Sequence, residues 1–263
     1  MRPLAEFPVE ARRAVTHVLT DIDDTVTTEG RLPSSSLAAM EALQAAGIRV
    51  IPVTGRPAGW CDHIARMWPV EAVVGENGAL WFSYDREGRR MLSGFARTPA
   101  QRRADRERLD RLREAILGQV PGAGIASDQF CRIADLAIDF REDVEPLAKN
   151  DIDRIVALFE AAGATAKVSS IHVNGWFGDY DKLTMTRICL ADRFGIDLDA
   201  ANERIVFAGD SPNDQPMFAF FRNSVGVANV RDFDLAMPPA WVTPGRAAEG
   251  FAELARALIE ARR

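Results

Sequence analysis

The sequence predicts an α/β protein in which a doubly wound parallel sheet is interrupted by an inserted α+β module. Short apolar strands alternate with amphipathic helices near both ends of the 263-residue chain, whereas residues 83–181 show hairpins and longer helices. Alternating strands and helices are typical of a parallel sheet that is covered on both faces. We therefore expect a core domain formed by residues 1–82 and 182–263, with a separate module between them.

The first part of the chain predicts three strands and two helices. Apolar runs at 14–20, 48–53 and 71–74 are typical of buried strands. Apolar residues recur at helical spacing in 37–43, and the segment 57–68 also favours a helix. Because ligands of such sheets bind at the carboxyl ends of the strands, the polar residues that follow these strands are candidates for a site.

The remaining elements are predicted in the same way. The inserted module should contain a hairpin of 80–84 with 91–95, helices at 101–117 and 151–162, and strands at 131–140 and within 164–173. The returning core should contain helices at 182–194, 214–221 and 248–261, and strands at 205–208 and 224–227. Acidic and basic residues alternate in 101–117, which indicates a solvated helix face rather than a nucleic-acid site.

Composition excludes several classes of function. A net charge of -6 argues against a broad nucleic-acid surface, which needs a surplus of clustered Lys and Arg. The three cysteines lie far apart, so neither a disulfide framework nor a zinc site is expected. The N-terminal segment has no apolar run long enough for a signal peptide or a membrane span, so we expect a cytoplasmic protein with no membrane partner. Its oligomeric state stays open.

Two short polar segments follow the first two strands. Asp21-Ile22-Asp23 offers two carboxylates that can take different tasks, nucleophilic attack and proton transfer, although a loop rich in turn-forming Asp explains them equally well. Thr54-Gly55-Arg56 combines a hydroxyl donor with a glycine whose backbone N–H can approach an anion closely. Each signal is weak by itself.

Two further segments begin the returning core. Lys182 opens a helix, where it could neutralise a phosphoryl oxygen or be an ordinary surface lysine. Gly209 to Asp214, with the sequence GDSPND, gathers carboxylate and amide oxygens directly after a strand. Such hard ligands suit Mg²⁺, and helix capping would explain only one of these acids.

In this order, the four segments resemble the motifs of the haloacid dehalogenase (HAD) superfamily of phosphatases. Asp21 to Thr25 is similar to its first motif (DxDxT), Thr54 to its second, Lys182 to its third, and Gly209 to Asp214 to its fourth (GDxxND). The resemblance extends from about Val15 to Val227 and implies a Rossmann-like core.

The long insertion and Asn77-Gly78-Ala79 resemble the subgroup with a C2-type (IIB) α+β cap, which includes Cof-type, sucrose-phosphatase-like and mannosyl-3-phosphoglycerate phosphatase-like enzymes. Two residues depart from the family pattern. Asp24 and Leu183 stand where many relatives have glycine, and Asp24 should change local backbone freedom more than chemistry.

The resemblance implies a mechanism and a cofactor. Asp21 would attack phosphorus to form an aspartyl-phosphate, and Asp23 would protonate the leaving oxygen and then activate water. Mg²⁺ would lie between the Asp21 carboxylate, the Asp23 backbone carbonyl and Asp210. The phosphoryl oxygens would be bound by Thr54, Gly55, Lys182 and Asn213. Asp214 would orient Lys182 or a metal-bound water.

The implied activity is hydrolysis of a small phosphorylated metabolite such as a sugar phosphate. A dehalogenase has no leaving alkoxide to protonate, so the second carboxylate disfavours that chemistry. A phosphomutase remains an alternative because it would use the same aspartyl-phosphate. A non-catalytic phospho-acceptor switch is less favoured, since an inserted lid that excludes water suits turnover.

The segment from Ser170 to Trp176 resembles the corresponding stretch of sugar-phosphate phosphatases. His172 could meet an anionic group and Trp176 could stack on a sugar ring, but a packing histidine and an anchor between cap and core explain them equally well. Arg56 and Arg132 are weaker candidates for substrate contacts. The physiological substrate is not predicted.

Overall fold

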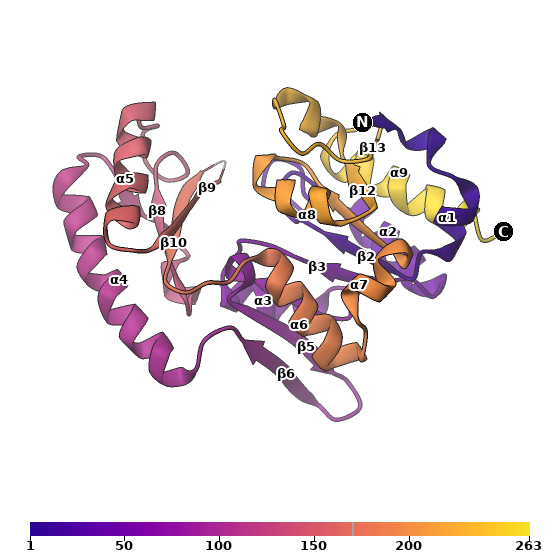
Figure 1. The fold of residues 1–263 in the computed structure, drawn as a ribbon, viewed down its shortest axis with the longest axis horizontal. Helices are drawn as coiled ribbons and strands as arrows, with labels where there is room; N and C mark the ends of the chain where they lie inside the picture. The colour runs from indigo at the N-terminus through magenta and orange to yellow at the C-terminus, as the bar shows by residue number, and fades with distance from the viewer. Residues whose placement is uncertain (170) are drawn as a thin grey trace.

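The core of the protein is a six-stranded parallel sheet with the strand order β1-β13-β12-β11-β2-β3. The computed structural model describes residues 1–169 and 171–263 (Figure 1). The strands of this sheet are β1 (Arg2–Pro3), β2 (His17–Thr20), β3 (Arg49–Pro52), β11 (Ile205–Gly209), β12 (Asn223–Gly226) and β13 (Trp241–Val242). The prediction of a parallel-sheet core is confirmed.

Helices cover both faces of this sheet because its strands are apolar on both sides. On β2, Val18 packs on one face with α1 (Val9–Ala14), α2 (Ser34–Ala45), α3 (Ala58–Met67) and α9 (Ala247–Glu260). The next residue, Leu19, packs on the other face with α6 (Lys182–Phe194), α7 (Leu198–Ala201) and α8 (Gln215–Phe220). This two-sided arrangement is the doubly wound fold that the sequence predicts.

A second sheet is formed by the residues that separate the two halves of the core in the sequence. It is antiparallel, with the order β7-β8-β10-β9, and its strands are β7 (Gly124–Ile125), β8 (Asp135–Asp139), β9 (Thr165–Val168) and β10 (His172–Trp176). Two long helices, α4 (Pro99–Gln119) and α5 (Lys149–Ala161), pack on one of its faces around Ile116, Ile138 and Phe159. Figure 1 shows this helix-covered unit beside the core. The helices leave the opposite face of the sheet uncovered.

A third, smaller sheet joins the two units. It consists of β4 (Val73–Gly75), β5 (Leu80–Asp85) and β6 (Arg90–Phe95), all antiparallel. The expected hairpin is confirmed, but β4 does not form a continuous ladder with β3: the two are linked by an isolated parallel bridge between Val53 and Val74. Leu80 and Phe82 belong to the core cluster, so the boundary expected at residue 83 falls inside a strand of the core. We propose that the inserted module starts after β6 instead.

Short 3₁₀ helices complete the elements. They are η1 (Leu4–Glu6), η2 (Glu76–Gly78), η3 (Gln129–Cys131), η4 (Asn202–Arg204), η5 (Pro212–Asp214) and η6 (Ala228–Asp232). The strand expected at 131–140 is shorter than predicted, because η3 occupies its first residue. Across the described part of the chain, no helix is both long enough and apolar enough to span a membrane.

Gly78 fixes the approach of η2 to the start of α6. Its φ is 104°, and a Cβ added there would lie 2.0 Å from the carbonyl oxygen of Asp181. We expect Gly78→Ala to lower the free energy of unfolding by about 3 kcal/mol or more, since backbone must move to admit the methyl group. Gly163→Ala is the matched control, because Gly163 also has a positive φ, 74°, but has open space around it. Urea unfolding of both variants tests this, and equal losses would contradict it.

Candidate active site

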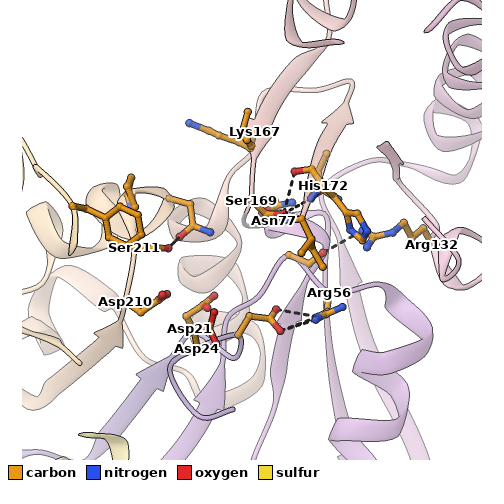
Figure 2. Close-up of a pocket in the computed structure, with 18 residues that line it drawn as sticks. Asp21, Asp24, Arg56, Asn77, Arg132, Lys167, Ser169, His172, Asp210 and Ser211 are labelled. Atoms are coloured by element: carbon orange, nitrogen blue, oxygen red, sulfur yellow. Dashed lines mark hydrogen bonds and ion pairs between the residues drawn. The ribbon is translucent and has the colours of Figure 1, made fainter. Parts of the chain in front are cut away.

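A cavity of about 290 Å³ lies between the carboxyl ends of the core strands and the uncovered face of the second sheet (Figure 2). Residues from distant parts of the chain line it: Asp21, Asp23, Asp24, Gly55, Arg56, Asn77, Asp210, Ser211 and Asn213 from the core, and Arg132, Lys167, Ser169, His172 and Asn174 from the inserted module. Most of the residues that the sequence singles out therefore share one cavity.

Asp21 lies directly beyond β2, where its backbone N–H still donates to the carbonyl of Ala208 at 2.9 Å. Its carboxyl group is buried and accepts a hydrogen bond from the Lys182 ammonium at 2.7 Å. Burial raises the pKa of Asp21 to about 7, against the lowering effect of Lys182 and with a further raising effect from Asp214. The group is thus held in place by a single cation.

The loop after Asp21 curls tightly. The Ile22 carbonyl accepts hydrogen bonds from the backbone N–H groups of Val26 and Thr27, both at 3.0 Å, and from the Thr27 hydroxyl at 3.1 Å. Asp24 adopts a φ of 53°, in the left-handed region that favours glycine. This is the position where many relatives have glycine, and Asp is among the residues that tolerate this conformation.

Asp23 is paired with a neighbouring arginine. Both of its oxygens accept hydrogen bonds from the Arg56 guanidinium, with Nε at 3.1 and 3.0 Å and Nη2 at 2.7 Å. The guanidinium also lies over the Trp60 ring, 4.4 Å from its centroid. Arg56, expected as a substrate contact, therefore has a role in positioning Asp23.

The second segment lies at the end of β3. Thr54 is fully buried, and its hydroxyl oxygen accepts a hydrogen bond from the backbone N–H of Arg56 at 3.1 Å. The hydroxyl group donates no hydrogen bond within the described residues, and Thr54 lies behind the cavity wall rather than on it. A Cβ on Gly55 would lie 3.1 Å from the Asn77 side-chain oxygen, so glycine keeps the approach to this backbone open.

Lys182 is the buried cation of the site. Its ammonium lies 2.7 Å from Asp21 and 3.0 Å from Asp214, and Asp181 caps the helix by accepting from the Thr184 N–H at 2.7 Å. Burial alone would lower the pKa of Lys182, but the charges of Asp21 and Asp214 outweigh it and raise the pKa. The lysine is therefore an ammonium, and Leu183 does not prevent it from reaching the site.

Asp210 and Asp214 complete an acidic cluster with Asp21, in which one oxygen of each lies within 4.8 Å of the others. Both Asp214 oxygens are already used, Oδ1 by Lys182 at 3.0 Å and Oδ2 by the backbone N–H of Asp210 at 3.1 Å. Burial, followed by the charges of Asp214 and Asp21, raises the pKa of Asp210 to about 9. Carboxylates so close together fit a divalent cation, and within the described residues Asp21 and Asp210 each keep at least one oxygen that accepts no hydrogen bond.

Asn213 lies on the cavity wall beside these acids. Its side-chain oxygen accepts a hydrogen bond from the Ser211 hydroxyl at 2.9 Å, and its NH₂ group donates to no other described residue. The fourth segment therefore supplies both acidic groups and a neutral donor.

Of the two residues predicted to contact the substrate from the segment 170–176, one lines the cavity and one does not. His172 lines the cavity, and its Nε2 lies 2.9 Å from a Glu142 oxygen. Trp176 is 2% exposed and stacks on Tyr180, with 5.9 Å between the ring centroids. It does not line the cavity, which favours its interpretation as an anchor between cap and core. Ser170, the first residue of the segment that suggested both, lies outside the described residues.

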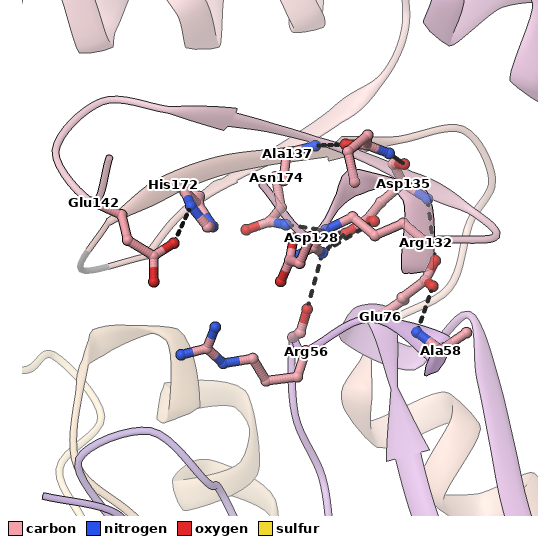
Figure 3. A network of polar contacts seen from close by, with 12 residues as sticks. Arg56, Ala58, Glu76, Asp128, Arg132, Asp135, Ala137, Glu142, His172 and Asn174 are labelled. Carbon is pink, nitrogen blue, oxygen red and sulfur yellow. Dashed lines mark hydrogen bonds and ion pairs between the residues drawn. The ribbon is translucent and has the colours of Figure 1, made fainter. Parts of the chain in front are cut away.

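Sequence reasoning missed a buried network that links the core to the inserted module (Figure 3). Glu76 is fully buried and accepts hydrogen bonds from the backbone N–H groups of Ala58 in the core and of residues 133–135 in the module. Arg132 also crosses between the units, donating to the Gly55 carbonyl at 3.2 Å. The sequence does not indicate this role of Glu76, because its partners at residues 133–135 are distant in the sequence.

Part of the chain resembles a known protein family. Residues 18–94 match the family model described as haloacid dehalogenase-like hydrolase. No curated protein matches the chain. The family match covers the first two candidate segments and the hairpin that follows them.

Solved structures match nearly the whole chain. A protein of Thermoplasma acidophilum is 18% identical with a TM-score of 0.67, covering 93% of this chain and 98% of that one. The sucrose-phosphatase of Synechocystis sp. PCC6803, solved with sucrose and phosphate, is 15% identical with a TM-score of 0.64, covering 94% and 98%. BT4131, a sugar phosphatase of HAD subclass IIB, is 15% identical with a TM-score of 0.64, covering 92% and 98%. At such low identities, these likenesses establish the fold.

Proposed function

We propose that this chain is a phosphatase of the haloacid dehalogenase superfamily that hydrolyses small phosphate monoesters through an aspartyl-phosphate on Asp21, because residues 18–94 match the model of haloacid dehalogenase-like hydrolases. The observation that carries this proposal is the buried triad of Asp21, Lys182 and Asp214, with ammonium-to-oxygen distances of 2.7 and 3.0 Å. A buried carboxylate at the end of a strand, oriented by one ammonium, is suited to attack an electrophilic phosphorus.

In the first step, an Asp21 oxygen attacks phosphorus and the ester oxygen leaves. Lys182 neutralises charge on the phosphoryl oxygens, since it already lies within hydrogen-bonding distance of Asp21. The Thr54 hydroxyl, the Gly55 N–H and the Asn213 NH₂ group donate to the same oxygens, and Asp214 holds Lys182 in position.

Asp23 transfers the protons of both steps. It protonates the leaving oxygen in the first step and takes a proton from the attacking water in the second, which releases inorganic phosphate. In the present arrangement both of its oxygens accept from Arg56, so Arg56 must give up at least one of these hydrogen bonds before Asp23 can act.

The acidic cluster supports a divalent metal as cofactor, and we propose Mg²⁺. The Asp21 and Asp210 carboxylates and the Asp23 carbonyl would hold it, because hard oxygen ligands suit this ion. When bound, the metal would neutralise the phosphoryl group so that an anionic nucleophile can approach it.

The inserted module acts as a cap over the site in this proposal. It supplies the wall opposite the core acids, which excludes water and surrounds a small substrate. The sucrose-phosphatase and the sugar phosphatase among the similar structures make a sugar phosphate the first substrate class to test.

The test is release of inorganic phosphate from p-nitrophenyl phosphate and from hexose, pentose and polyol monophosphates, with Mg²⁺ or with EDTA. We expect hydrolysis of several esters that stops when EDTA removes the metal. No hydrolysis of any ester, together with a stable covalent phosphate on the protein, would instead favour a phospho-acceptor switch.

Metal binding has a readout that does not depend on activity. We expect Mg²⁺ to raise the melting temperature, because it binds the folded acidic cluster and not the unfolded chain. Asp210→Asn should abolish this shift and should raise the melting temperature of the metal-free protein by about 3 °C, since the buried Asp210 carboxyl, with its raised pKa, must take up a proton on folding at neutral pH and asparagine need not. Thermal unfolding with and without Mg²⁺ measures both effects. An undiminished Mg²⁺ shift in the variant would contradict the assignment.

A further inference from the structure

Asn174 is a buried polar residue of the cap for which the proposed reaction has no role. It lies on β10, is 6% exposed and lines the cavity on the side opposite the core acids. Its Nδ2 donates to Asp135 Oδ2 at 3.0 Å. Within the described residues, no hydrogen bond uses its Oδ1, which is open to the cavity.

The orientation of this amide follows from its partner. Asp135 is fully buried, and its two oxygens accept from Arg132 Nη1 at 3.1 and 3.0 Å. An ionised carboxylate can only accept hydrogen bonds, so the NH₂ end of Asn174 must face it. The carbonyl end of Asn174 is thus the end available to a ligand (Figure 3).

The support behind Asn174 is rigid. Arg132 is 7% exposed and is also held by Asp128, with Nε to Oδ1 at 3.0 Å. Glu76 accepts from the backbone N–H groups of Ile133, Ala134 and Asp135 at 2.8, 2.6 and 3.2 Å. A fully bonded buried network of this kind fixes the side chains that it contains.

The charges around Asn174 decide what this position can bind. The guanidinium of Arg132 is already paired with two carboxylates, so it offers little to an incoming anion. A carbonyl oxygen repels anions and accepts from hydroxyl groups.

We infer that Asn174 is a specificity-determining residue whose carbonyl oxygen accepts a hydrogen bond from a substrate hydroxyl. The substrate class is then a phosphate monoester of a polyhydroxylated compound, a monosaccharide or a polyol, whose far end carries hydroxyl groups. This inference rests on the proposed phosphatase function and narrows it.

The experiment compares wild type with Asn174→Ala on the best hexose or polyol monophosphate, on deoxy analogues of that ester, and on p-nitrophenyl phosphate, which has no hydroxyl. We expect the ratio of kcat/KM for the best ester to kcat/KM for p-nitrophenyl phosphate to fall at least about tenfold. One deoxy analogue should be a poor substrate of wild type, and the variant should no longer distinguish it from the parent ester. If the alanine variant does not fold, Asn174→Ser replaces it, because its hydroxyl can still donate to Asp135.

Lys167→Ala is the matched control. Lys167 is the residue paired with Asn174 on β9; it is exposed, lines the same cavity and has no ion-pair partner among the described residues. Its loss should leave the kcat/KM ratio within about twofold of wild type. A tenfold fall with Lys167→Ala but not with Asn174→Ala, or a preference for bisphosphates, would mean an anion subsite and would overturn the inference.

The remaining outcomes separate this inference from the proposed function. Hydrolysis of esters with a ratio unchanged by Asn174→Ala would leave the phosphatase assignment standing and reject the role of Asn174. Failure of wild type to hydrolyse any ester with Mg²⁺ present would reject both.

Discussion

Replacing Asp21 with asparagine is expected to abolish hydrolysis of phosphate esters, with kcat lowered by on the order of 10⁴-fold or more. The amide keeps the size of the side chain and can stay beside Lys182, which lies 2.7 Å from the carboxylate in the native protein. It is a far poorer nucleophile, so the covalent intermediate cannot form. Steady-state release of inorganic phosphate measures the loss.

Asp24→Asn is the control for the loss of one negative charge. Asp24 lines the same cavity three residues along the chain, and its φ of 53° is one that asparagine tolerates. We expect its kcat to stay within about threefold of wild type. Similar losses in the two variants would mean that the cavity needs negative charge in general rather than a nucleophile at Asp21.

The second large effect is expected from Lys182→Met. It removes the cation between two buried carboxylates, Asp21 and Asp214, which are 4% and 0% exposed. Breaking such a buried ion pair costs about 3–5 kcal/mol, because the carboxylates stay buried without a partner. The kcat should also fall by at least about 10³-fold, since the variant lacks the ammonium that lies 2.7 Å from the nucleophile. Urea unfolding and phosphate release measure the two effects.

A double-mutant cycle identifies the origin of the stability loss. In the Asp21→Asn background, Lys182→Met should cost less, with a coupling energy of about 1–3 kcal/mol. The reason is that only Asp214 then remains as an unpaired buried carboxylate. Strictly additive losses would show that the cost arises from packing and not from the charges.

The sequence predicts the core of this fold well because its signals are local. The start of α6 at Lys182 and the strand before Asp210 follow from apolar periodicity and from the polar residues at their ends. The elements missed are those that lack such a signal. Helix α1 (Val9–Ala14) buries none of its residues, and β13 (Trp241–Val242) has only two residues, too few for a period.

The site is predicted less completely, since its second layer depends on contacts between distant segments. Nothing in the neighbourhood of Arg56 indicates that it pairs with Asp23, because the two lie on separate loops of the sheet edge. Alternation on β10 puts Trp176 on the same side as His172 and Asn174. It does not reveal that Ala79 and Tyr180 cover the tryptophan at the strand end.

The most direct test of the account is acid quenching of the protein during turnover with Mg²⁺ and an excess of its best phosphate ester, followed by peptide mass spectrometry. Acyl phosphates survive acid, so after digestion with pepsin at low pH we expect a peptide that carries the phosphate on Asp21, and none from Asp21→Asn. Rapid hydrolysis with no phosphate on Asp21 at any quench time, or with phosphate on another residue, would contradict the role of Asp21 as nucleophile.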